Sequence, residues 1–188
     1  RKKRITKLGE FDELHLVVDK CLSNLCMANK EFPESVQRVV ETGAALGVRV
    51  EPKTFPESTR TAQEAADAIG VDVGQIVKSL IFQVGQELVL AYVSGKNQLD
   101  EASLAAAAGG GKCKRVDAQT VREATGFSIG GVPPFGLREK LRVFIDETLL
   151  FYSEVWAAAG TPHAVFAIDP KDLVVASRGK VSEIASKN

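Results

Sequence analysis

Two apolar segments separated by only two residues constrain the fold of this 188-residue chain more than any other feature. Residues 75–84 (QIVKSLIFQV) and 87–94 (ELVLAYVS) are both rich in β-branched and aromatic residues, and only Gly85 and Gln86 lie between them. A two-residue connection that contains glycine is typical of an antiparallel hairpin. The chain is therefore predicted to build its core on a sheet with at least one antiparallel strand pair.

Helical and strand patterns alternate irregularly through the rest of the chain. After Pro33, apolar residues recur at helical spacing as far as Gly47, and the capping-box pair Thr61 and Glu64 begins a second predicted helix that ends at Gly70. Further helices are expected over 100–108, 117–125 and 170–176, and further strands over 48–51, 113–116, 142–149 and 163–168. Because no regular strand-helix-strand alternation occurs, we expect an α+β fold: a single domain with a mixed, mostly antiparallel, barrel-like sheet surrounded by helices.

The first 32 residues differ in composition from the remainder. They hold the basic cluster RKKR, two of the three cysteines and the only methionine. We therefore expect residues 1–32 to be an N-terminal extension or leader, and residues 33–188 to form one domain with one sizeable core. The odd number of cysteines and the lack of an apolar run of roughly 18 residues predict a cytoplasmic protein that does not associate with membranes.

Balanced charge and missing motifs exclude several function classes. Lys and Arg together number 24, as do Asp and Glu, so only local charge can hold a nucleic acid. Gly111 and Lys112 are followed by Cys113 rather than by Ser or Thr, which excludes a phosphate-binding P-loop. The chain has two histidines, and no Cys or His stands at metal-ligand spacing, so we expect neither a metal nor a cofactor.

Lys78 is the most informative single position. Strand alternation places it on one face of its predicted strand with the apolar residues Ile76 and Leu80. A charge among apolar neighbours is costly unless it pairs with a carboxylate, extends to water or faces a cavity that holds a ligand. Two alternatives stay open on these grounds: an edge lysine that reaches solvent, and a lysine in a binding site.

Two glycine-containing loops are the other candidate features. Residues 130–136 (GGVPPFG) combine glycines, which permit unusual dihedral angles, with prolines, which restrict them. Such a loop can present backbone N–H groups to a substrate oxygen, or it can simply be a turn. Residues 159–163 form a tight turn into a strand, where His163 is either an acid–base group near neutral pH or a structural histidine.

Four segments together resemble the YbaK and prolyl-tRNA synthetase-associated editing domains. They are residues 61–66 (TAQEAA), 75–80 (QIVKSL), 130–136 (GGVPPFG) and 159–170 (AGTPHAVFAIDP), and they occur in the order of that family. The resemblance extends from about residue 34 to the C-terminus. It implies the family's fold and its activity, which is hydrolysis of wrongly aminoacylated tRNA.

The resemblance also implies roles for particular residues. In that family a strand lysine lines the pocket for the aminoacylated terminal adenosine and is needed for deacylation, and a Gly-x-x-x-Pro loop places a backbone amide near the ester. Lys78 and Gly130 match these positions and are the predicted catalytic groups. The residues expected to contact substrate are Thr61, Ser79, Gly131, Val132, Pro134, Gly160 and His163.

The chain also departs from the family pattern. Many members carry a Ser-Gly-Gly-x-Arg-Gly type segment before the last core strand, whereas residues 158–163 here read AAGTPH. An aspartate that some relatives place shortly after that segment falls at Val165. The roles of that serine and arginine are therefore not carried over, and the cysteine-specific behaviour of YbaK itself is not expected.

The working hypothesis is hydrolysis of the ester between a small amino acid and the 3′ end of tRNA, with the proline acceptor as the expected tRNA and a synthetase as a further expected partner. The residues expected to contact tRNA are Lys112, Lys114, Arg115, Arg138 and Lys140, and the alternative is that these are ordinary solvated charges. Two rival functions stay open. One is a non-catalytic module that binds aminoacyl-tRNA or a synthetase, and the other is a small-molecule hydrolase or isomerase that uses Lys78 as base or Schiff-base nucleophile.

Overall fold

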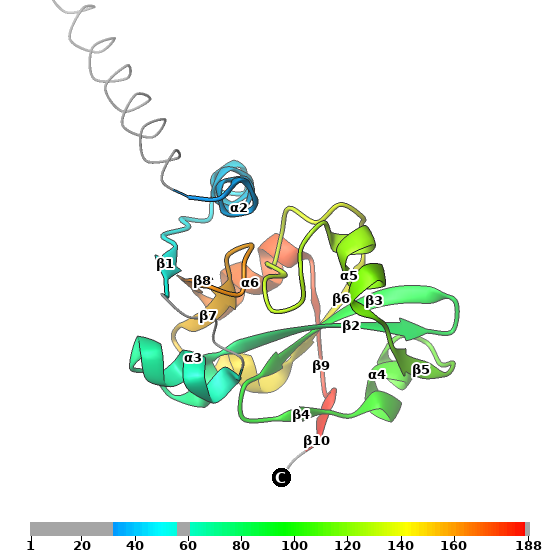
Figure 1. Cartoon of the computed structure of the whole chain (residues 1–188). Coiled ribbons are helices and arrows are strands. Elements are labelled where there is room, and N and C mark those ends of the chain that lie inside the picture. The colour runs from blue at the N-terminus through cyan, green and yellow to red at the C-terminus, as the bar shows by residue number, and fades with distance from the viewer. Residues whose placement is uncertain (1–31, 56–60, 187–188) are drawn as a thin grey trace, which may run out of the picture.

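A computed structural model describes residues 32–55 and 61–186 of the protein (Figure 1). The predicted N-terminal extension lies outside these residues apart from Phe32, so its boundary with the domain stays a prediction. In the described ranges, no helix combines the length and the apolar character needed to cross a lipid bilayer.

The central sheet has five strands in the order β5-β2-β3-β6-β9. The predicted hairpin is confirmed: β2 (Val77–Val84) and β3 (Glu87–Ser94) pair antiparallel along their whole length. The strand β5 (Cys113–Arg115) pairs antiparallel with the outer edge of β2, which is the edge away from β3. Beyond β3, the strand β6 (Arg142–Asp146) runs parallel to β3, and β9 (Lys180–Ser182) runs parallel to β6. The sheet is therefore mixed, as expected.

Two smaller sheets complete the α+β fold. The strands β1 (Lys53–Thr54), β8 (Ala164–Ile168) and β7 (Val155–Ala158) form an antiparallel sheet, and β10 (Ala185–Ser186) pairs antiparallel with β4 (Gln98–Leu99). The expected barrel does not close, because the outer edge of β2 meets β7 only at a bridge between Ile76 and Trp156 and meets β5 only from Phe82 onward. Between these two points the edge of β2 is open.

Five α-helices and two 3-10 helices lie around the sheets in the described ranges: α2 (Glu34–Ala45), α3 (Ala62–Ile69), α4 (Glu101–Ala107), α5 (Ala118–Thr125), α6 (Pro170–Ser177), η2 (Val73–Gln75) and η3 (Glu147–Phe151). All five predicted helices are confirmed. The predicted capping box is also present, because Glu64 N donates to Thr61 Oγ1 and Thr61 N donates to the Glu64 carboxylate.

Two predicted strands differ from the structure. Residues 48–51 form no strand, although Val48 and Val50 are buried, and the nearest strand is β1. The strand predicted over 142–149 ends at Asp146, because the carboxylate of Asp146 accepts a hydrogen bond from Thr148 N at 3.0 Å and begins η3. Alternating burial alone did not distinguish an irregular segment from a strand.

Both faces of the β2–β3 hairpin are covered. Val77, Ile81, Leu90 and Tyr92 pack into a large core together with α2, β7 and β8, whereas Phe82, Val89 and Ala91 pack with α4 on the opposite face. Figure 1 shows the same arrangement, with α5 and the loop that follows it on one side of β2 and α4 and β4 on the other. The open edge of β2 therefore lies between two packed layers.

Candidate active site

Two hollows meet at the open edge of β2. The first has a volume of about 340 Å³ and extends toward β4 and β5, where Gln98, Glu101 and Arg115 line it. The second has a similar volume of about 340 Å³ and extends toward α3 and β7. Both share four residues, which are Lys78, Ser79, Leu80 and Ile129. The two hollows form one groove, and its common centre includes Lys78 and Ser79, two of the residues that the sequence singled out.

Lys78 is held in this centre by the turn after β3. Its Nζ donates a hydrogen bond to the backbone carbonyl of Asn97. The side chain of Asn97 is held in turn, because its Nδ2 donates to Asp146 Oδ2 at 2.8 Å and to Thr148 Oγ1 at 2.9 Å. Lys78 is half-buried, and this desolvation lowers its pKa from the ordinary value, while the negative charge of Asp146 partly offsets the effect.

Asp146 is the buried anion behind Lys78. Its side chain is almost fully buried, and it also accepts hydrogen bonds from Ser94 N at 3.1 Å and Thr148 N at 3.0 Å. Buried carboxylates are stabilised by hydrogen-bond donors such as these. Asp146 and Asn97 therefore form a fixed support for the lysine, which the sequence reasoning missed because they are distant in the chain and belong to no motif.

Ser79 points to the opposite face from Lys78, because neighbouring residues in a strand alternate. It lies directly opposite Tyr92 of β3, whose hydroxyl donates to the carbonyl of Pro133 at 3.4 Å. Side chains of directly opposed residues lie on the same face, so Ser79 faces the 130–136 loop. Its Oγ is buried and has no hydrogen-bond partner among the described residues, which is a costly state for a polar atom unless a ligand supplies a partner.

The 130–136 loop covers the groove, and its first two glycines have different roles. Gly130 lines the second hollow with a positive φ of 83°, and its N–H donates to no other described residue. The N–H of Gly131 donates to Ser128 O at 2.9 Å, so it is already engaged. A Cβ on Gly131 would lie only 2.8 Å from Thr161 Cα, which shows how closely the loop packs on the 159–163 turn. Of the two amides, only that of Gly130 is free to meet a substrate.

Ile129 stands between the two hollows. It is 58% exposed and lines both of them. Residues 126–130 read GFSIG and so match the GxSxG pattern of serine hydrolases. In those enzymes the serine lies between a strand and a helix, whereas Ser128 follows the end of α5. The segment therefore has the pattern without the geometry of a nucleophile elbow.

The structure brings together some of the predicted substrate-contacting residues. Thr61 and Ser79 line the second hollow together with Lys78 and Gly130, and Val132 lines the first. Pro134 and Gly160 are buried and line neither hollow. His163 is exposed, its backbone carbonyl accepts from Phe55 N at 2.8 Å, and it also lines neither hollow, whereas its neighbour Pro162 lines the second.

Small side chains and one tryptophan shape the second hollow. Ala62 and Ala65 of α3 line it, as do Ala158 and Trp156 of β7. Trp156 is 5% exposed, and its Nε1 has no hydrogen-bond partner among the described residues. The sequence reasoning missed this wall because it predicted no strand over 155–158; the only available signal was the single tryptophan of the chain.

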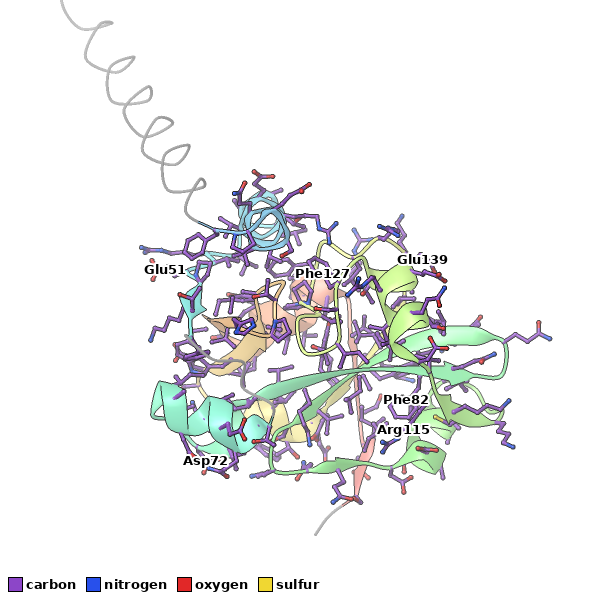
Figure 2. All side chains as sticks on the ribbon, in the orientation of Figure 1. Glu51, Asp72, Phe82, Arg115, Phe127 and Glu139 are labelled. Carbon is purple, nitrogen blue, oxygen red and sulfur yellow. The ribbon has the colours of Figure 1, made fainter. Side chains whose placement is uncertain are left out.

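The predicted tRNA-contacting residues form two groups. Lys112, Lys114 and Arg115 are exposed on or beside β5, and Arg115 reaches the first hollow, where its Nε lies 3.7 Å from Glu101 Oε1. Arg138 and Lys140 are exposed in the segment before β6. Figure 2 places Glu139, which lies between them in sequence, and Arg115 on opposite sides of β2. The five cations therefore come from two separate segments of the chain.

Metal ligation has no candidate in this part of the chain. In residues 32–55 and 61–186, no group of three or more His, Cys, Asp or Glu side chains is arranged to hold a metal ion. Cys113 is a free thiol beside β2, and burial together with nearby Glu101 raises its pKa, so it is largely protonated at neutral pH.

The site combines a half-buried lysine, a glycine loop with a free amide and two adjoining hollows, an arrangement that suits a ligand with two distinct parts. Comparisons with known proteins identify the class of protein to which the chain belongs. Residues 56–175 match the model of a family described as the aminoacyl-tRNA editing domain. The chain belongs to this family, which confirms the resemblance seen in the sequence.

Individual relatives agree with this assignment. The uncharacterized protein YwhH of Bacillus subtilis is 34% identical over 112 residues, which are 59% of this chain and 71% of that protein. An Enterococcus faecalis protein named "Putative Cys-tRNA(Pro)/Cys-tRNA(Cys) deacylase EbsC" is 27% identical over 119 residues, 62% of this chain and 72% of that protein. A crystal structure described as "a putative trans-editing enzyme for prolyl tRNA synthetase" is 43% identical, covers 83% of this chain and 99% of its own, and has a TM-score of 0.78.

Proposed function

We propose that this editing domain hydrolyses the ester between a small, wrongly attached amino acid and the 3′ end of tRNA, with the proline acceptor as its tRNA and a synthetase as a working partner in the cytoplasm. The observation that carries the proposal is that Lys78, at the centre of the groove, lines the same hollow as Gly130, whose backbone N–H has no partner among the described residues. The relatives named for Cys-tRNA(Pro) deacylation and for prolyl-tRNA editing support the choice of acceptor.

The two hollows suit the two parts of such a substrate. The second hollow, whose lining includes Ala62, Ala65, Ala158 and Trp156, suits a small amino-acid side chain. The first hollow has both apolar strand residues and the polar groups of Gln98, Glu101 and Arg115, which suits a nucleoside with a phosphate. In this arrangement the ester lies over the shared residues Lys78 and Ser79.

The reaction needs a positioned water and support for negative charge. A water oxygen adds to the ester carbonyl carbon, and the carbonyl π electrons move to the carbonyl oxygen. The C–O bond to the ribose then breaks, and the proton that the water loses is taken up by the leaving 3′ oxygen. The free N–H of Gly130 stabilises the oxyanion, and the Lys78 ammonium holds the phosphate or polarises the carbonyl. Because aminoacyl esters are already activated, the step proceeds without a covalent protein nucleophile.

The test is deacylation of a panel of tRNA(Pro) molecules that carry alanyl, seryl, cysteinyl or 2-aminobutyryl esters. The unaltered protein is expected to hydrolyse at least one of them, and Lys78→Ala is expected to reduce that rate by about 10²–10³-fold, the usual loss for one group that stabilises developing charge. Lys171→Ala, which removes an exposed lysine on α6, is the matched control and should leave the rate unchanged.

A non-catalytic module is the second candidate, since the family positions for serine and aspartate are occupied by other residues. It predicts that aminoacyl-tRNA binds and that no ester is hydrolysed faster than in buffer. Measuring hydrolysis beside binding for the same four tRNAs separates the two functions, because only the editing enzyme hydrolyses an ester that it binds.

A further inference from the structure

Because the N–H of Gly131 is already hydrogen-bonded, the 130–136 loop offers the proposed site one free backbone N–H, that of Gly130. The open edge of β2 contains a second free backbone N–H. The direction of the peptide groups along β2 follows from two hydrogen bonds. Gly95 N donates to Ile76 O at 2.8 Å on the β3 side, and Gly85 N donates to Lys112 O at 3.1 Å on the β5 side. In an antiparallel strand, successive residues direct both backbone groups alternately to one neighbour and to the other.

This alternation assigns every residue of β2 to one side. Even-numbered residues such as Lys78 and Leu80 direct their N–H and C=O to β3, and odd-numbered residues direct theirs to the outer edge. Ser79 lies between the bridge at Ile76 and the first β5 partner at Phe82, where no strand pairs with that edge. Its peptide N–H and C=O therefore face the groove, and no hydrogen bond joins them to another described residue.

We propose that the Ser79 peptide binds the aminoacyl group of the substrate as a single residue of an added antiparallel strand. An aminoacyl ester carries an α-ammonium donor and a carbonyl acceptor on one residue, which is the pair that an opposed strand residue would present to Ser79. Ser79 C=O accepts from the ammonium, and Ser79 N–H donates to the ester carbonyl. This inference rests on the proposed function and deepens it by naming the groups that recognise the amino acid.

The pairing has a consequence for the substrate side chain. Directly opposed residues of an antiparallel pair carry their side chains on the same face. An L-amino acid therefore directs its side chain to the face of Ser79 Oγ, toward the part of the second hollow that Gly130 lines. The buried Ser79 Oγ then gains a neighbour that it lacks in the free protein. The ester carbonyl meanwhile has two donors, the N–H of Ser79 and the N–H of Gly130.

The direct test uses two non-hydrolysable probes on the full chain. One is 3′-amino-3′-deoxyadenosine acylated with alanine through an amide, and the other carries a propionyl group, which lacks the ammonium. In ¹H–¹⁵N spectra, the alanyl probe is expected to move the Ser79 amide proton downfield. The propionyl probe is expected to bind roughly 10- to 100-fold more weakly, because a hydrogen bond from a charged group is lost. Binding of the alanyl probe without a shift of the Ser79 amide would overturn the proposal.

A pair of variants tests the same contact during deacylation. Ser79→Pro removes the N–H at an edge position where a strand tolerates proline, and Ser79→Ala keeps the peptide group. We expect Ser79→Pro to lower kcat/KM at least roughly 10-fold relative to Ser79→Ala. Equal rates in two folded variants would contradict the pairing while deacylation itself stands. An alanyl probe that shifts the Ser79 amide in a protein that hydrolyses no ester would support the pairing and refute the proposed reaction.

Discussion

Lys78 Nζ donates a hydrogen bond to the backbone carbonyl of Asn97, so the lysine at the centre of the groove is attached to the turn that follows the next strand. The attachment continues to Asp146, which accepts from the Asn97 side chain and lies at the end of β6. Three strands of the central sheet therefore determine where one ammonium group lies. The position of that ammonium depends on residues that line neither hollow.

Asp146→Asn should lower the pKa of Lys78 further. The charge of Asp146 raises this pKa against the larger lowering effect of burial, and the neutral amide removes the raising contribution. Since the proposed reaction needs the ammonium form, the rate should then fall at a lower pH in the variant than in the unaltered protein. Titration of the Lys78 Nζ by ¹⁵N NMR measures the pKa directly. An unchanged or higher pKa in a folded Asp146→Asn protein would contradict this prediction.

Gly160→Ala should be strongly destabilising although Gly160 lines neither hollow. Its φ is 98°, and an added Cβ would lie 2.5 Å from Ser35 O in the segment that begins α2. Strain at a positive φ costs about 1–2 kcal/mol, and overpacking adds about 1–3 kcal/mol.

Gly70→Ala is the control for this measurement, because Gly70 has a φ of 83° and an added Cβ meets no atom within 4 Å. The free energy of unfolding of Gly70→Ala should therefore fall only by the strain contribution. Urea denaturation of both variants measures the free energies of unfolding, and equal losses would show that the contact with Ser35 is unimportant.

Ala158→Val should sharpen discrimination between alanyl and 2-aminobutyryl esters. Ala158 lines the second hollow, and the added methyl groups reduce the space for a longer side chain. One methylene in a pocket is worth about 1–3 kcal/mol, so the ratio of the two kcat/KM values should rise about 10- to 200-fold. Val116→Ile in the first hollow is the control, because it should slow both esters equally. If Val116→Ile changed the ratio and Ala158→Val slowed both esters equally, the first hollow and not the second would hold the amino-acid side chain.

Lys112→Ala combined with Lys114→Ala should reduce the salt dependence of tRNA binding. Each lost phosphate contact lowers the slope of log K against log salt concentration by about 0.7 for single strands to 0.9 for duplex, so the pair should lower it by about 1.4–1.8. Arg138→Ala with Lys140→Ala tests the second group separately, since these two residues lie in the segment before β6 and not on β5. A slope unchanged in the first double variant would remove β5 from the tRNA interface.

Local sequence was sufficient for the elements and for part of the site. The two-residue connection at Gly85 and Gln86 predicted the hairpin, and the Thr61–Glu64 pair predicted the start of α3, because both depend on residues a few positions apart. Lys78 and Gly130 were recognised by motif and lie in the same hollow. By contrast, Pro134, Gly160 and His163 belong to matching motifs and line neither hollow.

The sequence by itself determined the hairpin, the five helices and the family, since these follow from short-range periodicity and from motifs in a fixed order. Only the tertiary structure decided that the edge of β2 stays open at Ser79, that Asp146 stands behind Lys78, and that Trp156 and Ala158 form the wall of the second hollow. These relationships join residues 19 to 80 positions apart by hydrogen bonds and packing. Such contacts form only when strands pair, and a pattern read along a single chain does not contain the pairing.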